Sequence, residues 1–345
     1  MVKLEDVYAA LKEVMDLRKV RNVLISKTDK GVKVKFTLIA PADQMEELKR
    51  KAAQAVGALE GVVEVEIVEQ PQQPVSPKLR KHPDIKHIIA VTSGKGGVGK
   101  STVAANLAVA LAAKNFKVGL LDGDIYGPSI PKMLGLEGMV PYAEKGKIIP
   151  VERFGIKVLS IGLLIEEDTP VIWRGPLVHK AYEQFYFDVN WGELDFLIVD
   201  FPPGTGDPQI SAAQLMKLRG GIAVTTPQDV SISDVKKAIN MFKKMEIPVI
   251  GVVENMSYFR CPKCGEITRI FGEGGGKKIE QVMNVELLAQ IPLDPDLVKS
   301  GDIGMPIVFS KPNSEAAKVY LELAEKVAKK CESIAEQAPV SLKMA

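Results

Sequence analysis

The chain has 345 residues, of which 46% are hydrophobic and 26% charged, and its formal net charge is +2. This composition is typical of a folded globular protein with a large core and room for a second, smaller domain. The balanced charge gives no strong basic field for nucleic acid, and no apolar run reaches the roughly 18 residues of a membrane span. The N-terminal residues also lack the apolar run of a signal peptide, so we expect a cytoplasmic protein with no nucleic-acid or membrane partner.

Residues 1–69 are predicted to form a small α+β domain. The pattern predicts a helix over 5–15, strands over 22–27 and 32–38 joined by a turn, a helix that begins at Pro41, and a strand over 62–68. Four prolines then follow among polar residues, at positions 71, 74, 77 and 83. Such a composition favours an extended linker, which we assign to residues 70–85.

Residues 86–345 alternate short apolar runs with helical periods. The runs are 88–91, 118–121, 196–199, 222–225 and 249–253. Continuous apolar strands separated by helices predict a mostly parallel sheet covered by helices on both faces, the α/β class. A final helix over 315–334 carries Cys331 on its apolar stripe, so we interpret this cysteine as a structural core residue.

A glycine-rich loop follows the first of these strands. Residues 94–101 match G-x-x-x-x-G-K-[ST] in full, between an apolar strand and an apolar helix. Backbone N–H groups of such a loop converge on phosphate oxygens, Lys100 reaches the β- and γ-phosphates, and Ser101 binds Mg²⁺. The sequence therefore predicts an ATP site. Its expected cofactor-binding residues here are Gly94, Lys95, Gly96, Gly97, Val98, Gly99, Lys100, Ser101 and Thr102.

Lys95 is an additional lysine at the start of this loop, and its plainer interpretation is a solvated side chain. The motif K-G-G-V-G-K-S resembles the deviant Walker A sequence of the MinD/ParA/Mrp group of P-loop ATPases, in which two subunits enclose two ATP molecules face to face. The resemblance implies a homodimer in which Lys95 acts on the partner's nucleotide, as an arginine finger does elsewhere.

Acidic residues follow two of the predicted strands. Asp122 and Asp124 come after 118–121, and Asp200 comes after 196–199, at the edge where open α/β sheets place ligand chemistry. Asp200 is expected to hold the Mg²⁺ shell, and an Asp-Gly turn is the plainer interpretation of the first pair. The resemblance implies that Asp124 positions the attacking water and that Asp122 supports Mg²⁺.

The expected catalytic residues are accordingly Lys95, Lys100, Asp124 and Asp200. Asn255 and Pro292 match positions that contact adenine in the resembled group, although Asn255 could equally cap a strand end.

Further motifs narrow the resemblance. DGDIYGPSIPKMLG, WRGP at 173–176, DFPPGTGD, TTPQDVS, ENMS and FGEGGG at 271–276 together resemble the Mrp/ApbC family of iron-sulfur cluster carriers over about residues 87–330. The N-terminal domain resembles the iron-sulfur assembly domain often fused ahead of these carriers. It departs from that domain in having no cysteine, because the first cysteine of the chain is Cys261.

Cys261 and Cys264 form a Cys-Pro-x-Cys-Gly turn, for which we weigh three interpretations. The pair could be inert, or it could be a dithiol switch activated by Arg260 and Lys263. Metal binding is favoured, because two such pairs on a dimer axis complete a Cys₄ site. Cys₄ suits Zn²⁺ or a [4Fe-4S] cluster, and the family resemblance favours the cluster.

We therefore expect a slow, switch-type ATPase that is a homodimer, assembles a bridging [4Fe-4S] cluster and transfers it to apoproteins. The alternatives are a MinD/ParA-type positioning ATPase and a zinc-bridged targeting ATPase.

Overall fold

The computed structural model describes residues 2–40, 42–71, 82–164 and 175–334. The chain divides into two compact units, Met1–Pro77 and Lys78–Ala345. Most of the predicted linker and the first two residues of the WRGP motif lie outside the described residues. At the margins of the predicted linker, strand structure extends to Pro71 and begins again at Ile85. No helix of the described ranges is long and apolar enough to cross a membrane.

The first unit is a three-stranded sheet with two helices. Its elements are α1 (Leu4–Val14), the 3₁₀ turn Leu17–Lys19, β1 (Val20–Thr28), β2 (Gly31–Ala40), α2 (Ala42–Gly57) and β3 (Val62–Pro71). The central strand β2 pairs antiparallel with β1 and parallel with β3. Val34 and Phe36 of β2 are buried in one core with Val7 and Leu11 of α1. The helices and strands predicted for this region are confirmed.

The second unit is built on an eight-stranded sheet. In spatial order its strands are β15 (Leu287–Gln290), β12 (Val249–Glu254), β11 (Gly220–Thr225), β4 (Ile85–Ser93), β10 (Leu194–Asp200), β5 (Val118–Asp122), β9 (Ile156–Ser160) and β8 (Val151–Arg153). All neighbours pair in parallel except β8 with β9. The predicted α/β class with a mostly parallel sheet is confirmed.

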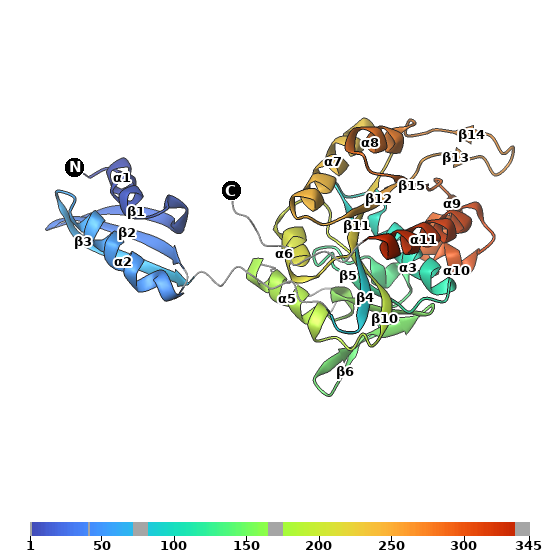
Figure 1. Cartoon of the computed structure of the whole chain (residues 1–345), viewed down its shortest axis with the longest axis horizontal. Helices are drawn as coiled ribbons and strands as arrows, with labels where there is room; N and C mark the ends of the chain where they lie inside the picture. The colour runs from blue at the N-terminus through green and yellow to red at the C-terminus, as the bar shows by residue number, and fades with distance from the viewer. Residues whose placement is uncertain (1, 41, 72–81, 165–174, 335–345) are drawn as a thin grey trace. The chain divides into compact units, whose positions relative to one another are not determined.

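Helices cover both faces of this sheet (Figure 1). One face carries α3 (Lys100–Ala113), α4 (Ile130–Met133), α9 (Pro295–Asp302), α10 (Ile307–Ser310) and α11 (Glu315–Ser333). The other carries α5 (Gly175–Phe187), α6 (Asp207–Leu215), α7 (Asp229–Lys244) and α8 (Gly275–Met283). Along β4, Ile89 packs in the core with α3 and α11, and Ile88 packs in the core with α5 and α6. Strand residues alternate between faces, so an uninterrupted apolar strand requires both layers.

Cys331 lies fully buried on α11 beside Val327 and Leu323. Its predicted role as a core residue is confirmed.

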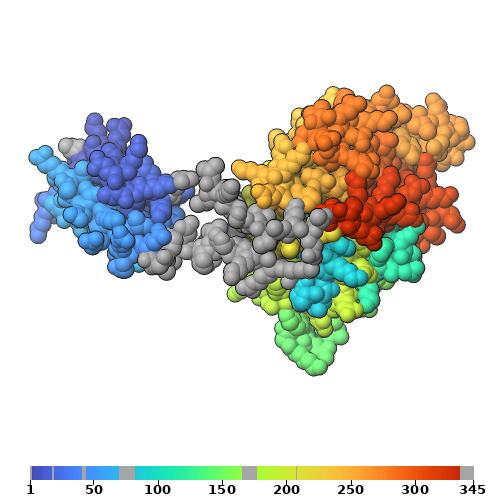
Figure 2. Space-filling view, viewed as in Figure 1, coloured from blue at the N-terminus to red at the C-terminus, as the bar shows by residue number. Residues whose placement is uncertain are grey.

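Two small hairpins interrupt the layers. One pairs β6 (Tyr142–Glu144) with β7 (Lys147–Ile149), and it protrudes in green at the lower edge of Figure 2. The other pairs β13 (Phe259–Arg260) with β14 (Ile267–Thr268) and extends outward beyond β12 and α8 in Figure 1. A short 3₁₀ turn, Ile161–Leu163, follows β9. The second hairpin carries the cysteine pair at its tip.

Candidate functional site

The glycine-rich loop connects β4 to α3. Gly97 and Gly99 have positive φ angles of 79° and 82°, which glycine adopts at little cost. A Cβ atom at Gly94 would lie 2.1 Å from the carbonyl carbon of Asp234 in α7, so packing also requires glycine there. Because α3 begins at Lys100, the free amides of its first turn directly follow the loop. This geometry suits an anion.

Lys100 joins the loop to the acidic residues at the ends of β10 and β5. Its Nζ lies 2.7 Å from Oδ1 of Asp200 and 3.7 Å from Oδ2 of Asp124, and it donates to Ser101 Oγ at 3.2 Å. The Lys100 side chain is only 7% exposed, so these contacts are little screened by water. The structure thus brings together the lysine, serine and carboxylates that the sequence placed on separate elements.

Asp122 is buried beside Asp200, its register partner on β10. Its Oδ2 accepts from Ser160 Oγ at 2.8 Å and from the Ile130 amide at 3.4 Å, and its Oδ1 accepts from the Asp124 amide at 3.1 Å. Burial, followed by the charge of Asp200, raises the pKa of Asp122 to about 7. Burial also raises the pKa values of Asp124 and Asp200, and Lys100 opposes both shifts.

One carboxylate oxygen of this cluster has no partner. Within the described residues, Asp200 Oδ2 is buried and makes no hydrogen bond, whereas both oxygens of Asp122 are occupied. Mg²⁺ prefers hard oxygen ligands and keeps several waters. The hydroxyl of Ser101 and the orphaned oxygen of Asp200 fit this ion, and the expected support of Mg²⁺ by Asp122 stays a prediction.

Lys95 has a different environment from Lys100. Its side chain is half-exposed, and its carbonyl oxygen accepts from Ser93 Oγ at 2.8 Å. In the part of the chain that the structure describes, its ammonium has no hydrogen-bond or ion-pair partner. A cation at the mouth of the loop is therefore available to a group outside this subunit.

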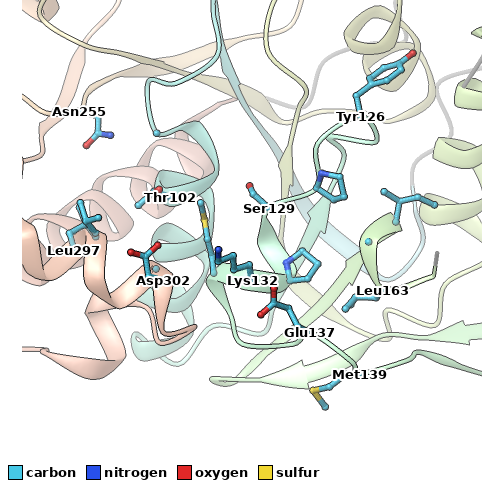
Figure 3. A pocket seen from close by; sticks show the side chains of 18 of the residues that line it. Thr102, Tyr126, Ser129, Lys132, Glu137, Met139, Leu163, Asn255, Leu297 and Asp302 are labelled. Atoms are coloured by element: carbon cyan, nitrogen blue, oxygen red, sulfur yellow. The ribbon is translucent and has the colours of Figure 1, made fainter. Parts of the chain in front are cut away.

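A cavity of about 1450 Å³ opens beside the loop, and Gly99, Thr102, Asn255 and Pro292 line it (Figure 3). Asn255 donates from Nδ2 to the Val98 carbonyl at 2.9 Å, which ties it to the loop. Its buried Oδ1 has no partner among the described residues and remains able to accept a hydrogen bond. The two predicted adenine-contacting residues thus share one cavity with the loop.

The far side of this cavity is more apolar than the sequence indicated. Tyr126, Met139 and Leu163 line it opposite Asn255 and Thr102 in Figure 3. Tyr126 lies in the DGDIYGPSIPKMLG motif, whereas Met139 and Leu163 lie outside every motif noted in the sequence. Their place in the cavity wall follows from the fold, which brings the segment after β5 and the 3₁₀ turn after β9 to the same cavity as α9.

The cysteine pair lies at the tip of the β13–β14 hairpin. The Cys261 amide donates to the Glu266 carbonyl at 2.9 Å, and the Gly265 amide donates to the Cys261 carbonyl at 2.8 Å. Gly265 has a φ of 76°, as this reversal requires. Backbone amides of Cys264 and Lys263, together with the Cys264 side chain, hydrogen-bond to Cys261 and lower the pKa of its thiol. The thiolate, which is the metal-binding form, is therefore favoured.

The chain offers two thiols at this position, fewer than the four ligands of a tetrahedral metal site. Cys261 is half-exposed and Cys264 exposed, and no third histidine, cysteine or carboxylate joins them among the described residues. The hairpin is fastened at its first strand, where Arg260 Nε lies 2.9 Å from Glu315 Oε2 and Tyr258 donates to Glu315 Oε1 at 2.8 Å. Burial, followed by the Glu315 bond, raises the pKa of Tyr258 to about 12. The contacts with Glu315 thus hold in place the hairpin that carries the two thiols.

Two residues of the nucleotide site had no signal in the sequence. Ser160, which donates to Asp122, ends the unpredicted strand β9. Tyr182 on α5 donates to the Gly123 carbonyl at 2.6 Å and so holds the backbone between Asp122 and Asp124. A serine and a tyrosine in ordinary apolar surroundings carry no motif, and only the fold brings them to the site.

The fold and the phosphate loop define a P-loop protein of the nucleoside-triphosphate-binding class. Residues 84–328 match the profile of the NUBPL iron-transfer P-loop NTPases, and residues 4–67 match that of an iron-sulfur cluster assembly protein. The chain therefore belongs to the family of NUBPL-type iron-transfer P-loop NTPases.

Individual relatives agree with this membership. The chain is 53% identical over 264 residues to an iron-sulfur cluster carrier protein of Aquifex aeolicus, covering 76% of this chain and 72% of the relative. It is 46% identical over 330 residues to one of Synechocystis, covering 92% of both chains. A nucleotide-binding protein of Archaeoglobus fulgidus in complex with ADP is similar in structure, with a TM-score of 0.58 and 44% identity over 64% of this chain and 87% of that one.

Proposed function

We propose that this protein is an ATP-hydrolysing homodimer that assembles a [4Fe-4S] cluster between its subunits and transfers it to apoproteins. The observation that carries the proposal is the pair of half-exposed Cys261, whose thiol pKa is lowered, and exposed Cys264, in the same unit as a complete phosphate loop. The names of the relatives from Aquifex aeolicus and Synechocystis, iron-sulfur cluster carrier proteins, support it.

ATP would bind with its phosphates on the amides of residues 94–99 and on Lys100, and with its base in the cavity lined by Asn255 and Pro292. Mg²⁺, held by Ser101 and Asp200, would neutralise phosphate charge. Asp124 would orient the water that attacks the γ-phosphorus while ADP leaves. The contacts of Lys100 with Asp200 and Asp124 support this arrangement, because they bring the lysine and both carboxylates to the end of the phosphate loop.

A dimer supplies what one subunit lacks. A two-fold axis beside the hairpin brings two cysteine pairs together and gives four thiolates, the ligand set of a [4Fe-4S] cluster. The same symmetry allows Lys95, which has no partner in the described part of its own subunit, to reach the nucleotide of the other. Four thiolates also suit a bridging Zn²⁺, which is the second candidate ligand.

Transfer fits the exposure of the pair. Cys264 is exposed, so a thiolate of a client protein can approach the cluster and replace it as a ligand. In such an exchange the client thiolate forms one iron–sulfur bond as the carrier thiolate leaves another, and no net oxidation occurs. ATP hydrolysis would shift the dimer between arrangements that hold and release the cluster.

Anaerobic reconstitution with iron and sulfide tests this proposal. We expect cluster absorbance at one [4Fe-4S] per dimer, transfer of the cluster to an apoprotein, and loss of absorbance in Cys264→Ser. Cys331→Ser is the matched control, because Cys331 is buried in the core, and it should reconstitute normally. A chain that takes up no cluster while Zn²⁺ binds at one per dimer would favour the zinc candidate.

A further inference from the structure

Glu254, the last residue of β12, is a buried carboxylate outside the nucleotide and cysteine sites. Its side chain is engaged on both oxygens: Oε1 accepts from Ser257 Oγ and, at 2.8 Å, from Gln290 Nε2, and Oε2 accepts from the Gly276 amide. Glu254 is only 1% exposed. A buried carboxylate is costly unless such bonds satisfy it, so these contacts hold its neighbours firmly.

These partners lie at the two ends of the segment that carries the cysteine pair. Residues 260–270 are exposed or half-exposed, and the chain becomes buried again only at Ser257 on one side and at Gly275 and Gly276 on the other. Glu254 bonds both ends. One carboxylate therefore joins the two ends of residues 257–276, a largely solvent-exposed segment that we call the excursion. Figure 1 shows it extending beyond α8.

The glycines of the FGEGGG motif allow this closure. A Cβ at Gly275 would lie 2.8 Å from the Pro227 carbonyl oxygen and 3.1 Å from Glu254 Oε2. A Cβ at Gly276 would lie 2.6 Å from Leu287 Cδ1. Only glycine lets the start of α8 approach β12 closely enough for the Gly276 amide to reach the carboxylate. The ENMS and FGEGGG motifs are thus joined by the hydrogen bond from the Gly276 amide to the Glu254 carboxylate.

The next residue along the chain serves the nucleotide site. Asn255 donates from Nδ2 to the Val98 carbonyl of the phosphate loop, and its backbone amide donates to the Thr225 carbonyl at 2.8 Å. Adjacent side chains at the end of a strand point in opposite directions. The side chain of Glu254 therefore hydrogen-bonds the two ends of the segment that carries the cysteines, and the side chain of Asn255 hydrogen-bonds the phosphate loop.

We propose that Glu254 is a positioning residue for the cysteine pair, whose carboxylate fixes both ends of the 257–276 excursion and links it mechanically to the phosphate loop. This inference rests on the proposed function, since it presumes that the pair binds metal. It assigns a role to a side chain that touches neither the nucleotide nor the metal. A loosened base would let the whole hairpin shift, so that the cysteine pairs of two subunits would no longer meet in one geometry.

The test is a Co²⁺ titration of the full-length protein, because thiolate-to-cobalt absorbance reports directly on the cysteine ligands. Glu254→Gln keeps the size of the side chain but replaces one acceptor oxygen with a donor that faces the Gly276 amide or Gln290. We expect Co²⁺ affinity to fall about tenfold, the lower end of the losses that follow when the support of metal ligands is removed. ATP affinity should change less than twofold, since Asn255 keeps its bond to the loop.

Glu280→Gln is the matched control. Glu280 lies in the same helix α8 and its Oε1 accepts from the Leu287 amide at 3.1 Å, but it bonds neither end of the excursion. Its Co²⁺ affinity should stay at the wild-type value. Should Glu254→Gln fold poorly, Ser257→Ala removes one bond to the same carboxylate and should weaken Co²⁺ binding by a smaller factor.

The outcomes separate the inference from the proposed function. Equal Co²⁺ affinity in wild type, Glu254→Gln and Ser257→Ala would overturn the positioning role and leave the metal site intact. Equal losses in Glu254→Gln and Glu280→Gln would also overturn it, because they would reflect general loosening of α8. Absence of thiolate-to-cobalt absorbance in the wild type would overturn the metal-binding function itself.

Discussion

At the scale of a single residue, the buried carboxylate of Asp122 lowers the stability of the fold when it is ionised. The buried carboxylates of Asp122 and Asp200 lie side by side near Lys100. Burial, followed by the charge of Asp200, raises the pKa of Asp122 to about 7. An unfolded aspartate titrates near its ordinary value of about 3.9. Between these values the folded state binds more protons than the unfolded state. The free energy of unfolding of the nucleotide-free protein should therefore fall as pH rises from about 4 to about 7.

Asp122→Asn should remove the part of this dependence that Asp122 contributes, and the raised pKa values of Asp124 and Asp200 should leave a smaller one. The amide oxygen can still accept from the Asp124 amide, and the amide nitrogen can donate to Ser160 Oγ, so only the long bond from the Ile130 amide, at 3.4 Å, is lost. At pH 8 we expect the variant to be more stable by on the order of 1–3 kcal/mol, since one pKa unit corresponds to about 1.4 kcal/mol. At pH 4, close to the unfolded pKa, the two proteins should be nearly equal. Urea unfolding at both pH values measures the difference, and parallel pH profiles would contradict the argument.

At the scale of an element, α5 supports the nucleotide site from outside it. Tyr182 donates to the Gly123 carbonyl at 2.6 Å, and Tyr186, one turn later, accepts from the His82 amide at 2.9 Å, far from the phosphate loop. Both tyrosines are fully buried. The pair therefore offers two similar hydroxyl-to-backbone bonds, of which only one adjoins Asp122 and Asp124.

Tyr182→Phe should lower the turnover of ATP about tenfold, which corresponds to about 1.4 kcal/mol of transition-state stabilisation, with little change in ATP affinity. Each Phe variant should lose about 1 kcal/mol of stability for its missing hydrogen bond. Tyr186→Phe should keep normal turnover. Steady-state kinetics of both variants at equal fractions folded provides the comparison, and similar turnover losses would indicate a general weakening of α5.

The elements differ in how far the sequence predicted them. The central strands β4, β5, β10, β11 and β12 were predictable because burial on both faces makes each an uninterrupted apolar run. The strands β8 and β15 were not, since three or four residues give too short a pattern, and Lys157 interrupts the apolar run of β9. Lys100 and Asp200 carried motif signals. Tyr182 carried none, and the ENMS motif that contains Glu254 indicated no role for this side chain, because both roles arise from contacts that only the folded chain creates.

For the whole molecule, two features of a single subunit are incomplete in a complementary way. The cysteine hairpin offers two thiols of the four that the proposed metal site requires, and Lys95 is a cation at the loop that lacks a partner within the described residues. A closed two-fold dimer completes both with one symmetry operation. If the proposal is right, a subunit that lacks Lys95 should recover ATP turnover when its partner supplies that lysine.

This repair can be measured with two inactive variants. Lys100→Ala lacks the ammonium that meets Asp200 and should bind no ATP, whereas Lys95→Ala should bind ATP normally and turn it over slowly. In a mixed dimer assembled through the metal site, the Lys100→Ala subunit still offers its Lys95 to the ATP of the other. Random assortment of equal amounts should restore roughly a quarter of wild-type turnover, because half of the dimers are mixed and each has one complete site. If Lys95 instead acted within its own subunit, no mixture could exceed the residual turnover of its components.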